Sequence, residues 1–320
     1  MTNQSKTIFT AIIILALMAT GATWLVERLS YYTLPTRGGI STSIEVAVSP
    51  KLFEWVQAAA TDFNDSNSQI TVTVTEVDSK RIDSALGAGI ESLPDVWIPE
   101  AGFVAQQNGS ATYNRSGESV ASDKLLWAKP ANQPYALDWQ MLHDAAVNDR
   151  QFNIALPSAN NTTAIATCLS AANTFHQTTE LDFALANDSA LKAWFNEIRD
   201  AIPNQTDPYA QLVRRPPAID VVMITASEGV ELNADFETAS PLFDITFDYP
   251  YVTRSTWAEL SADDAAAKQT AVDRFFEALN ASSAQSDLAA YGLSPALSLA
   301  VEGETTFNSR VIQALQWCWQ

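Results

Sequence analysis

Residues 44–64 read IEVAVSPKLFEWVQAAATDFN, and this stretch decides the fold class. The mostly apolar run from Ile44 to Val48 predicts a short strand, and Ser49 followed by Pro50 is a favourable cap and first turn for a helix. Apolar side chains then recur at i, i+4, i+7 and i+11, namely at Leu52, Val56, Ala59 and Phe63. A strand that runs directly into a helix with one buried face is the opening unit of an α/β fold.

Two further strands follow this unit. Ile70–Val77 (ITVTVTEV) alternates with period two, and Pro94–Pro99 (PDVWIP) brackets a short strand with little polar character, as a parallel sheet covered on both faces requires. The order of strand, helix and strand therefore predicts an open α/β sheet. Because ligands bind beyond the carboxyl ends of the strands in such sheets, we expect the functional residues there.

A second α/β unit is predicted after the short strand Leu125–Ala128. Its strands are Phe152–Leu156 and Ile219–Ile224, and the polar turn Pro157–Thr163 leads into a helix. The segment Leu242–Val252 is extended as well. Other helices are predicted from Asp138 to Val147, from Ser189 to Arg199, from the cap at Ser261, up to Gly292, and through Val311, Leu315 and Cys318.

The composition argues against nucleic-acid binding and against the common catalytic sites. The 320 residues carry a formal net charge of −19 at pH 7, which repels phosphate backbones. Two histidines and two cysteines leave little for a zinc site, and no nucleophile elbow, phosphate-binding loop, His-Glu-x-x-His or Cys-x-x-Cys pattern occurs in the sequence. We predict a protein that is not an enzyme and that uses no cofactor or metal ion.

The N-terminal residues predict a membrane anchor. The stretch 8–26 (IFTAIIILALMATGATWLV) contains no charge, and about 20 such residues cross a bilayer. Lys6 precedes it, which favours a body on the extracytoplasmic side of the cell membrane. We predict a single-pass signal anchor at 1–28 and a linker at 29–42. The alternative is a signal peptide that is cleaved near 20–22.

Export also bears on the only two cysteines. Cys168 and Cys318 form an even pair in a compartment that permits disulfides, so we predict a bridge between them. The alternative is two separately buried free thiols.

The strand ends and helix starts supply the candidate binding residues. They follow the predicted strands, begin the helix after the polar turn, or lie where the chain returns to the first unit. The predicted ligand-binding residues are Ser49, Pro50, Lys51, Ser79, Trp97, Glu100, Ser158, Asn160, Asn161, Thr162, Ser227, Glu228 and Tyr249.

Each candidate also has a structural interpretation. Trp97 either offers an aromatic platform to a ligand or packs in the core. Glu100 and Glu228 either accept hydrogen bonds from a cation, amine or hydroxyl, or are solvated loop residues. Tyr249 either contacts ligand or packs at a hinge. The polar turn before Thr162 either donates to a ligand or caps its helix.

Four stretches taken together resemble a known family. IEVAVSPKLFEWVQAAATDFN, PDVWIP, FDYPYV and LAAYGLSPA occur in an order that resembles the extracellular solute-binding proteins of the type 2 periplasmic-binding fold. The likeness covers most of residues 44–296 and is greatest to the branch that accompanies von Willebrand factor A domains in bacteria. The chain lacks the Asp-x-Ser-x-Ser metal-binding pattern of that domain, which would then belong to a separate partner.

The resemblance implies two α/β lobes crossed twice by the chain, with a small-molecule ligand in the cleft between them. The crossings would be Leu125–Lys129 and Thr246–Tyr251, with the first lobe at 43–127 plus 250–320 and the second at 128–249. Such a protein would present its ligand to a membrane transporter. Two alternatives remain at this point: a cell-surface module that binds a partner protein with no small ligand, and an extracellular hydrolase that uses acidic residues.

Overall fold

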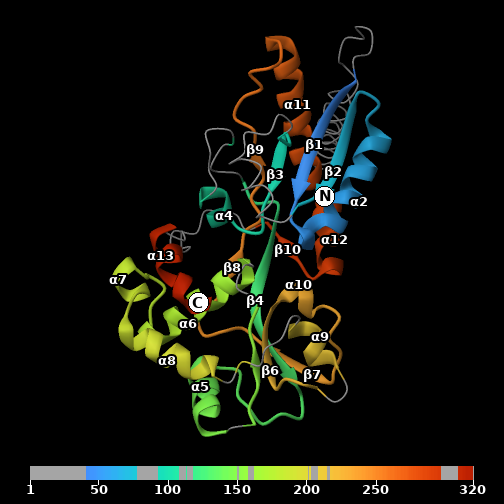
Figure 1. Cartoon of the computed structure of the whole chain (residues 1–320). Helices are drawn as coiled ribbons and strands as arrows, with labels where there is room; N and C mark the ends of the chain where they lie inside the picture. Colours follow the sequence, from blue (N-terminus) through green and yellow to red (C-terminus); the bar gives the residue numbers. More distant parts are fainter. Residues whose placement is uncertain are drawn as a thin grey trace, which may run out of the picture. The chain divides into compact units, whose positions relative to one another are not determined.

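The structure is a computed structural model that describes residues 41–77, 93–107, 113, 118–149, 151–157, 162–200, 202, 208–214, 217–296 and 309–319 (Figure 1). Thr42–Gln320 forms one compact unit. The predicted anchor at 1–28 lies outside the described residues. Among the helices described, none is both long enough and apolar enough to cross a membrane.

The first sheet has the strand order β2-β1-β3-β9. Strands β1 (Thr42–Val48), β2 (Ile70–Glu76) and β3 (Val96–Ile98) are parallel, and β9 (Val252–Thr253) joins the edge antiparallel to β3. The three strands predicted from the sequence are therefore confirmed, with β1 in the centre. Val48 and Ile98 end side by side, so the carboxyl ends of β1 and β3 share one edge.

Two long helices cover this sheet, and together with it they make up the first lobe. α2 (Pro50–Ser66) and α11 (Ala262–Leu279) pack against each other, and α11 also lies along β1. Their facing rings, Phe63 and Phe275, meet edge to face with centroids 5.5 Å apart. The predicted cap of α11 is confirmed, because the Ser261 side chain accepts from the backbone N–H of the third residue that follows.

The second sheet is organised by the ten-residue strand β4 (Ala121–Pro130). β4 begins before Leu125, where the sequence predicts the start of the strand. The sequence does not indicate its first half because Ser122, Asp123 and Lys124 are polar. β4 pairs antiparallel with four short strands: β10 (Ser294–Pro295), β6 (Val221–Thr225), β7 (Phe236–Ala239) and β8 (Thr246–Phe247). A fifth short strand, β5 (Ile154–Ala155), pairs in parallel with β6. Between β8 and β9 the chain returns to the first sheet, inside the predicted range.

Six of the described helices pack on the second sheet or on one another and with the sheet form the second lobe. They are α5 (Trp139–Asn148), α6 (Thr162–His176), α7 (Phe183–Ala186), α8 (Ser189–Arg199), α9 (Pro208–Val213) and α10 (Ala226–Gly229). The predicted Asp138 cap of α5 is confirmed. Trp139 lies in the centre, packed edge-on against Trp127 at 4.7 Å and bonded through its indole N–H to Ser170 Oγ at 2.9 Å.

The remaining helices connect these parts. α4 (Gly102–Gln107) follows β3, and α12 (Ser282–Asp287) continues into a 3-10 turn, η1 (Leu288–Tyr291). The predicted stop at Gly292 is confirmed: its φ is +70°, a left-handed conformation that glycine adopts without strain.

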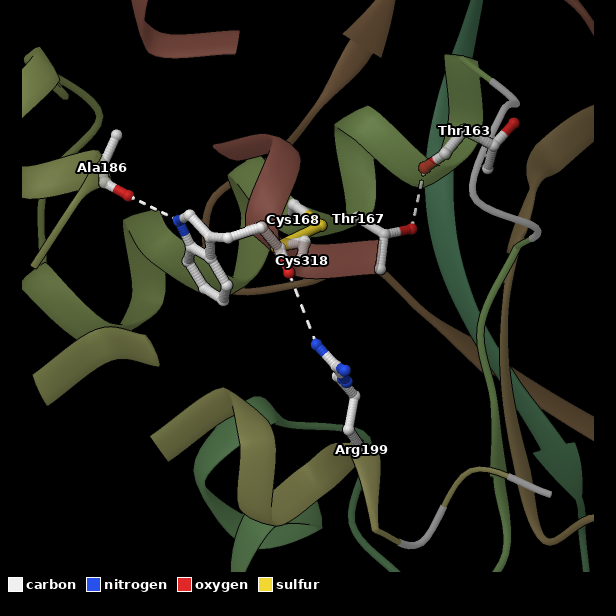
Figure 2. Close-up of a disulfide and its surroundings, with 7 residues drawn as sticks. Thr163, Thr167, Cys168, Ala186, Arg199 and Cys318 are labelled. Atoms are coloured by element: carbon white, nitrogen blue, oxygen red, sulfur yellow. Dashed lines mark hydrogen bonds between the residues drawn. A yellow bond between two sulfur atoms is a disulfide. The ribbon is translucent and has the colours of Figure 1, made fainter. Parts of the chain in front are cut away.

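The C-terminal segment packs on the second lobe. α13 (Ser309–Ala314) and the 3-10 helix η2 (Leu315–Trp319) contact α6, α7 and α8, and α13 also contacts α4. The predicted disulfide is confirmed, with the Cα atoms of Cys168 and Cys318 6.3 Å apart (Figure 2). Trp317 Nε1 also donates to the Ala186 carbonyl at 2.9 Å. The sequence predicts that residues 250–320 belong to the first lobe. The last segment instead packs on the second lobe, because the disulfide holds it to α6 and the Trp317 indole holds it to α7.

A buried carboxylate ties the first lobe together. Asp95 is 4% exposed and accepts from Lys268 Nζ at 2.7 Å, Trp257 Nε1 at 2.6 Å and the Glu45 backbone N–H at 2.9 Å. The bonds join the start of β3 to β1, to α11 and to the segment before α11. A buried carboxylate needs this set of donors, because an unpaired charge is strongly destabilising.

We predict that Lys268→Met lowers the free energy of unfolding by about 2–3 kcal/mol, because it leaves the Asp95 carboxylate buried without its cation. Urea unfolding followed by circular dichroism measures the change. The matched control is Lys124→Met, which removes the same charge from an exposed position on β4. Equal losses in the two variants would contradict the role assigned to Asp95.

We also predict that the double variant Cys168→Ala, Cys318→Ala loses about 2–4 kcal/mol of stability, because the bridge restricts the unfolded chain over a sequence separation of 150 residues. Dithiothreitol should lower the thermal midpoint of the wild-type chain and leave that of the double variant unchanged. A reductant effect of the same size on both proteins would show that the bridge contributes nothing.

Candidate functional site

Lys51 lies where the two lobes meet. It follows β1 in the first turn of α2, and its ammonium donates to two hydroxyls of the second lobe, Thr163 Oγ1 at 3.1 Å and Thr225 Oγ1 at 3.2 Å. The carboxylate of Glu228 lies 3.5 Å from the same nitrogen. The Phe247 ring centroid is 5.7 Å away. The Lys51 side chain is only 14% exposed, so these groups replace most of its water.

Local sequence explains how the second lobe presents these acceptors. Thr225 ends β6 and caps α10, where Glu228 is the third residue. The backbone N–H of Thr225 donates to Glu228 Oε2 at 2.8 Å, and the Glu228 N–H points back to Thr225 Oγ1 at 3.4 Å. This reciprocal capping box fixes both side chains at the carboxyl end of the strand.

A second buried carboxylate lies beside this cap. Asp123, 1% exposed, accepts from Ser227 Oγ at 2.6 Å, from the Ser227 N–H at 3.2 Å and from the N–H of Lys124 at 2.7 Å. Tyr249 is fully buried and hydrogen-bonds to the same carboxylate. Burial raises the pKa of the Tyr249 hydroxyl well above its usual value, and the negative charges of Asp123, Glu100 and Glu228 raise it further.

Ser49 has a buried hydroxyl without a partner. The residue is 1% exposed, and its Oγ makes no hydrogen bond within the described part of the chain. It precedes α2 as the N-cap but makes no side-chain capping bond, while its backbone N–H donates to the Ile98 carbonyl at 3.0 Å. An unsatisfied buried hydroxyl destabilises a protein, and at a strand end such a group is available to a ligand.

The other predicted site residues divide into three groups. Pro50 is exposed at the start of α2, Glu100 is partly buried after β3, and Thr162 is buried at the start of α6. Trp97 is 1% exposed and packs edge-on against Tyr113, so its ring is a core group in this structure. The remaining four lie outside the described residues: Ser79, Ser158, Asn160 and Asn161.

Sequence reasoning did not single out four residues of the site. Thr163 belongs to the predicted polar turn but was not chosen, and Thr225 is one residue beyond the predicted end of its strand. Asp123 is hidden in the polar half of β4. Phe247 begins the stretch FDYPYV but resembles an ordinary core residue. Only the strand ends carried a usable signal, and extending each predicted end by one residue would have found Thr225.

A further acidic group lies near the return to the first sheet. Asp248 Oδ1 accepts from the Gly102 N–H at 2.6 Å at the start of α4. Burial raises the pKa of Asp248 above its usual value, and this backbone bond opposes the rise. A Cβ at residue 102 would come within 2.7 Å of the carboxylate, so glycine allows the approach.

An open cavity of about 440 Å³ occurs away from these residues, at the far end of β4. It is lined by Lys129, Tyr135, Ala136, Leu137, Glu237, Thr238 and Ala239. Lys129 Nζ is bonded there to the Gln133 carbonyl at 2.7 Å and to Glu237 at 3.0 Å. Within the described ranges no cluster of three or more His, Cys, Asp or Glu is placed to hold a metal ion.

Two α/β lobes, with polar side chains meeting at the carboxyl ends of β1 and β6, define a two-lobed binding protein of the periplasmic-binding type. The chain belongs to the family of bacterial extracellular solute-binding proteins, whose model matches residues 44–294. This confirms the resemblance to the extracellular solute-binding proteins and the two-lobed α/β fold.

Solved structures support the same fold. The ferric binding protein from Campylobacter jejuni has a TM-score of 0.60 at 11% identity, over 85% of this chain and 96% of that chain. The periplasmic thiamin binding protein has a TM-score of 0.60 at 9% identity, over 90% and 98%. The sulfate-binding protein SubI from Mycobacterium tuberculosis has a TM-score of 0.54 at 15% identity, over 79% and 87%. A comparison with curated proteins returned no significant match.

We predict that Ser49→Ala raises the free energy of unfolding by about 1 kcal/mol, because it removes a buried hydroxyl that has no partner. The control is Ser119→Ala, since Ser119 Oγ is buried too but donates to the Ala121 carbonyl at 2.8 Å. That variant should lose about 1 kcal/mol. Urea unfolding of both variants measures the difference, and a loss of stability in Ser49→Ala would contradict the unpaired state of its hydroxyl.

Proposed function

We propose that the protein binds a small solute between its two lobes and presents it to a membrane transport system. The observation that carries the proposal is the cross-lobe contact of Lys51 with Thr163, Thr225 and Glu228, together with the unpaired hydroxyl of Ser49, which precedes Lys51 by two residues in the chain. These groups lie at strand ends or helix starts of both lobes, so a solute among them would contact both at once. Binding and lobe closure would therefore be linked.

The names of structurally similar proteins support a solute but not its identity. They refer to iron, thiamin and sulfate, which share neither charge nor shape. At 9–15% identity the likeness extends to the fold alone. Family membership favours binding without chemical conversion, and we propose that the protein is not an enzyme.

The location and partners form a second part of the proposal. The uncharged stretch 8–26 would anchor the protein as a single-pass helix, with its body on the extracytoplasmic side. The resemblance to the branch that accompanies von Willebrand factor A domains suggests a separate partner chain of that type. The disulfide supports an oxidising compartment.

One observation favours a second candidate function. The contacts of Lys51 join the lobes by protein groups alone. A site filled in this way would suit a surface module that uses the same fold to bind a partner protein. The two functions differ in whether a small molecule stabilises the folded state.

The test is thermal unfolding of the full-length chain in detergent against sugars, amino acids, oxyanions, amines and metal ions. A solute should raise the midpoint in a concentration-dependent way, as linkage requires. We predict that Ser49→Ala weakens that solute's affinity by about three- to tenfold, the effect of one hydrogen bond, without loss of stability. If no solute moves the midpoint of the wild-type chain, the partner-binding module replaces this proposal.

A further inference from the structure

The acceptors that hold Lys51 have the chemistry of an ammonium site. An ammonium group carries three N–H donors and accepts nothing, and here it lies against two hydroxyl oxygens and one carboxylate oxygen, at 3.1, 3.2 and 3.5 Å. The face of Phe247 lies 5.7 Å from the nitrogen, within the range of a cation–π contact. All four groups belong to the second lobe, whereas the lysine belongs to the first.

We propose that Thr163, Thr225, Glu228 and Phe247 form a subsite for a primary ammonium group of the solute, and that the Lys51 ammonium occupies this subsite when solute is absent. This inference rests on the proposed function and names its solute class: a primary amine that is cationic at neutral pH. We call these four residues the ammonium subsite.

The surrounding charge also favours a cation over an anion. Asp123, Glu100 and Glu228 all act on buried Tyr249 and raise its pKa, so their combined field at this point is negative. The donors to Asp123 are a serine, a tyrosine and backbone N–H groups, and none of these neutralises its charge. Once the Lys51 ammonium has left the subsite, an oxyanion placed here would face carboxylates, whereas an ammonium group would be attracted to them.

Exchange between lysine and solute conserves the charge of the subsite. A solute ammonium that enters takes the three acceptors, and the Lys51 ammonium is released to water. The lysine is therefore an internal competitor, and the apparent affinity of the wild-type chain for amines is the intrinsic affinity multiplied by the fraction of time that the subsite is free of the lysine. Removing the lysine should therefore create a site for a small amine.

The test uses the full-length variant Lys51→Ala with n-propylammonium, which has the atoms that the substitution deletes. We expect a saturable rise of about 2–4 °C in the thermal midpoint of Lys51→Ala and a much smaller rise in the wild-type chain. The control Lys124→Ala removes the same charge from an exposed position and should not respond. Tetramethylammonium, which has the charge but no N–H donor, should have no effect on either variant.

A second substitution tests the charge of the subsite where no lysine competes for it. Glu228→Gln keeps the capping-box geometry with Thr225 but removes the negative charge. In the Lys51→Ala background, adding Glu228→Gln should abolish most of the rise in the thermal midpoint with n-propylammonium. An equal rise with and without Glu228→Gln, or no rescue of a folded Lys51→Ala variant by n-propylammonium, overturns the ammonium subsite.

The outcomes separate this inference from the proposed function. If a sugar or sulfate stabilises the wild-type chain in a Ser49-dependent way and no amine does, the solute-binding function stands and the amine class is wrong. If n-propylammonium rescues Lys51→Ala but no solute stabilises the wild-type chain, the subsite stands as the acceptor set of a permanent lysine contact. The inference that it receives a solute is then wrong, together with the proposed function.

Discussion

The arrangement of the two lobes depends on one requirement: a lysine ammonium that is withdrawn from water must be surrounded by acceptors. Lys51 meets this requirement with groups from the opposite lobe, because its own helix start supplies none. The acceptors are held in turn by the capping box at the end of β6, and the neighbouring Ser227 is held by buried Asp123. The capping residues at the start of α10 in the second lobe thus determine that a cationic group of the first lobe can bind there.

Most of the secondary structure could be predicted from the sequence because its signals are local. Period-two alternation marked β2, the Ser-Pro start marked α2, and Asp138 and Ser261 marked two helix starts. The family resemblance added the two-lobed fold, which no local pattern contains. The long strand β4 was recognised only in its apolar half, since Asp123 is buried by hydrogen bonds and not by hydrophobicity.

The candidate site was harder to predict because its contacts join residues far apart in the sequence. The strand-end rule found Ser49, Lys51 and Glu228, but nothing local shows that Lys51 meets Thr163 and Thr225. The same rule could not distinguish a strand-end aromatic in the core, such as Trp97, from one in a cleft. The packing of the C-terminal segment on α6 also depended on a pairing that spacing alone does not determine.

The bridge between Cys168 and Cys318 has a topological consequence. It closes the chain between these residues into a covalent ring, and this ring includes β6 to β9 and α11, so it passes through both sheets. A protein-digesting enzyme that cuts the backbone once inside the ring opens it but releases no fragment. A molecule nicked in this way would keep both lobes in one covalently connected structure.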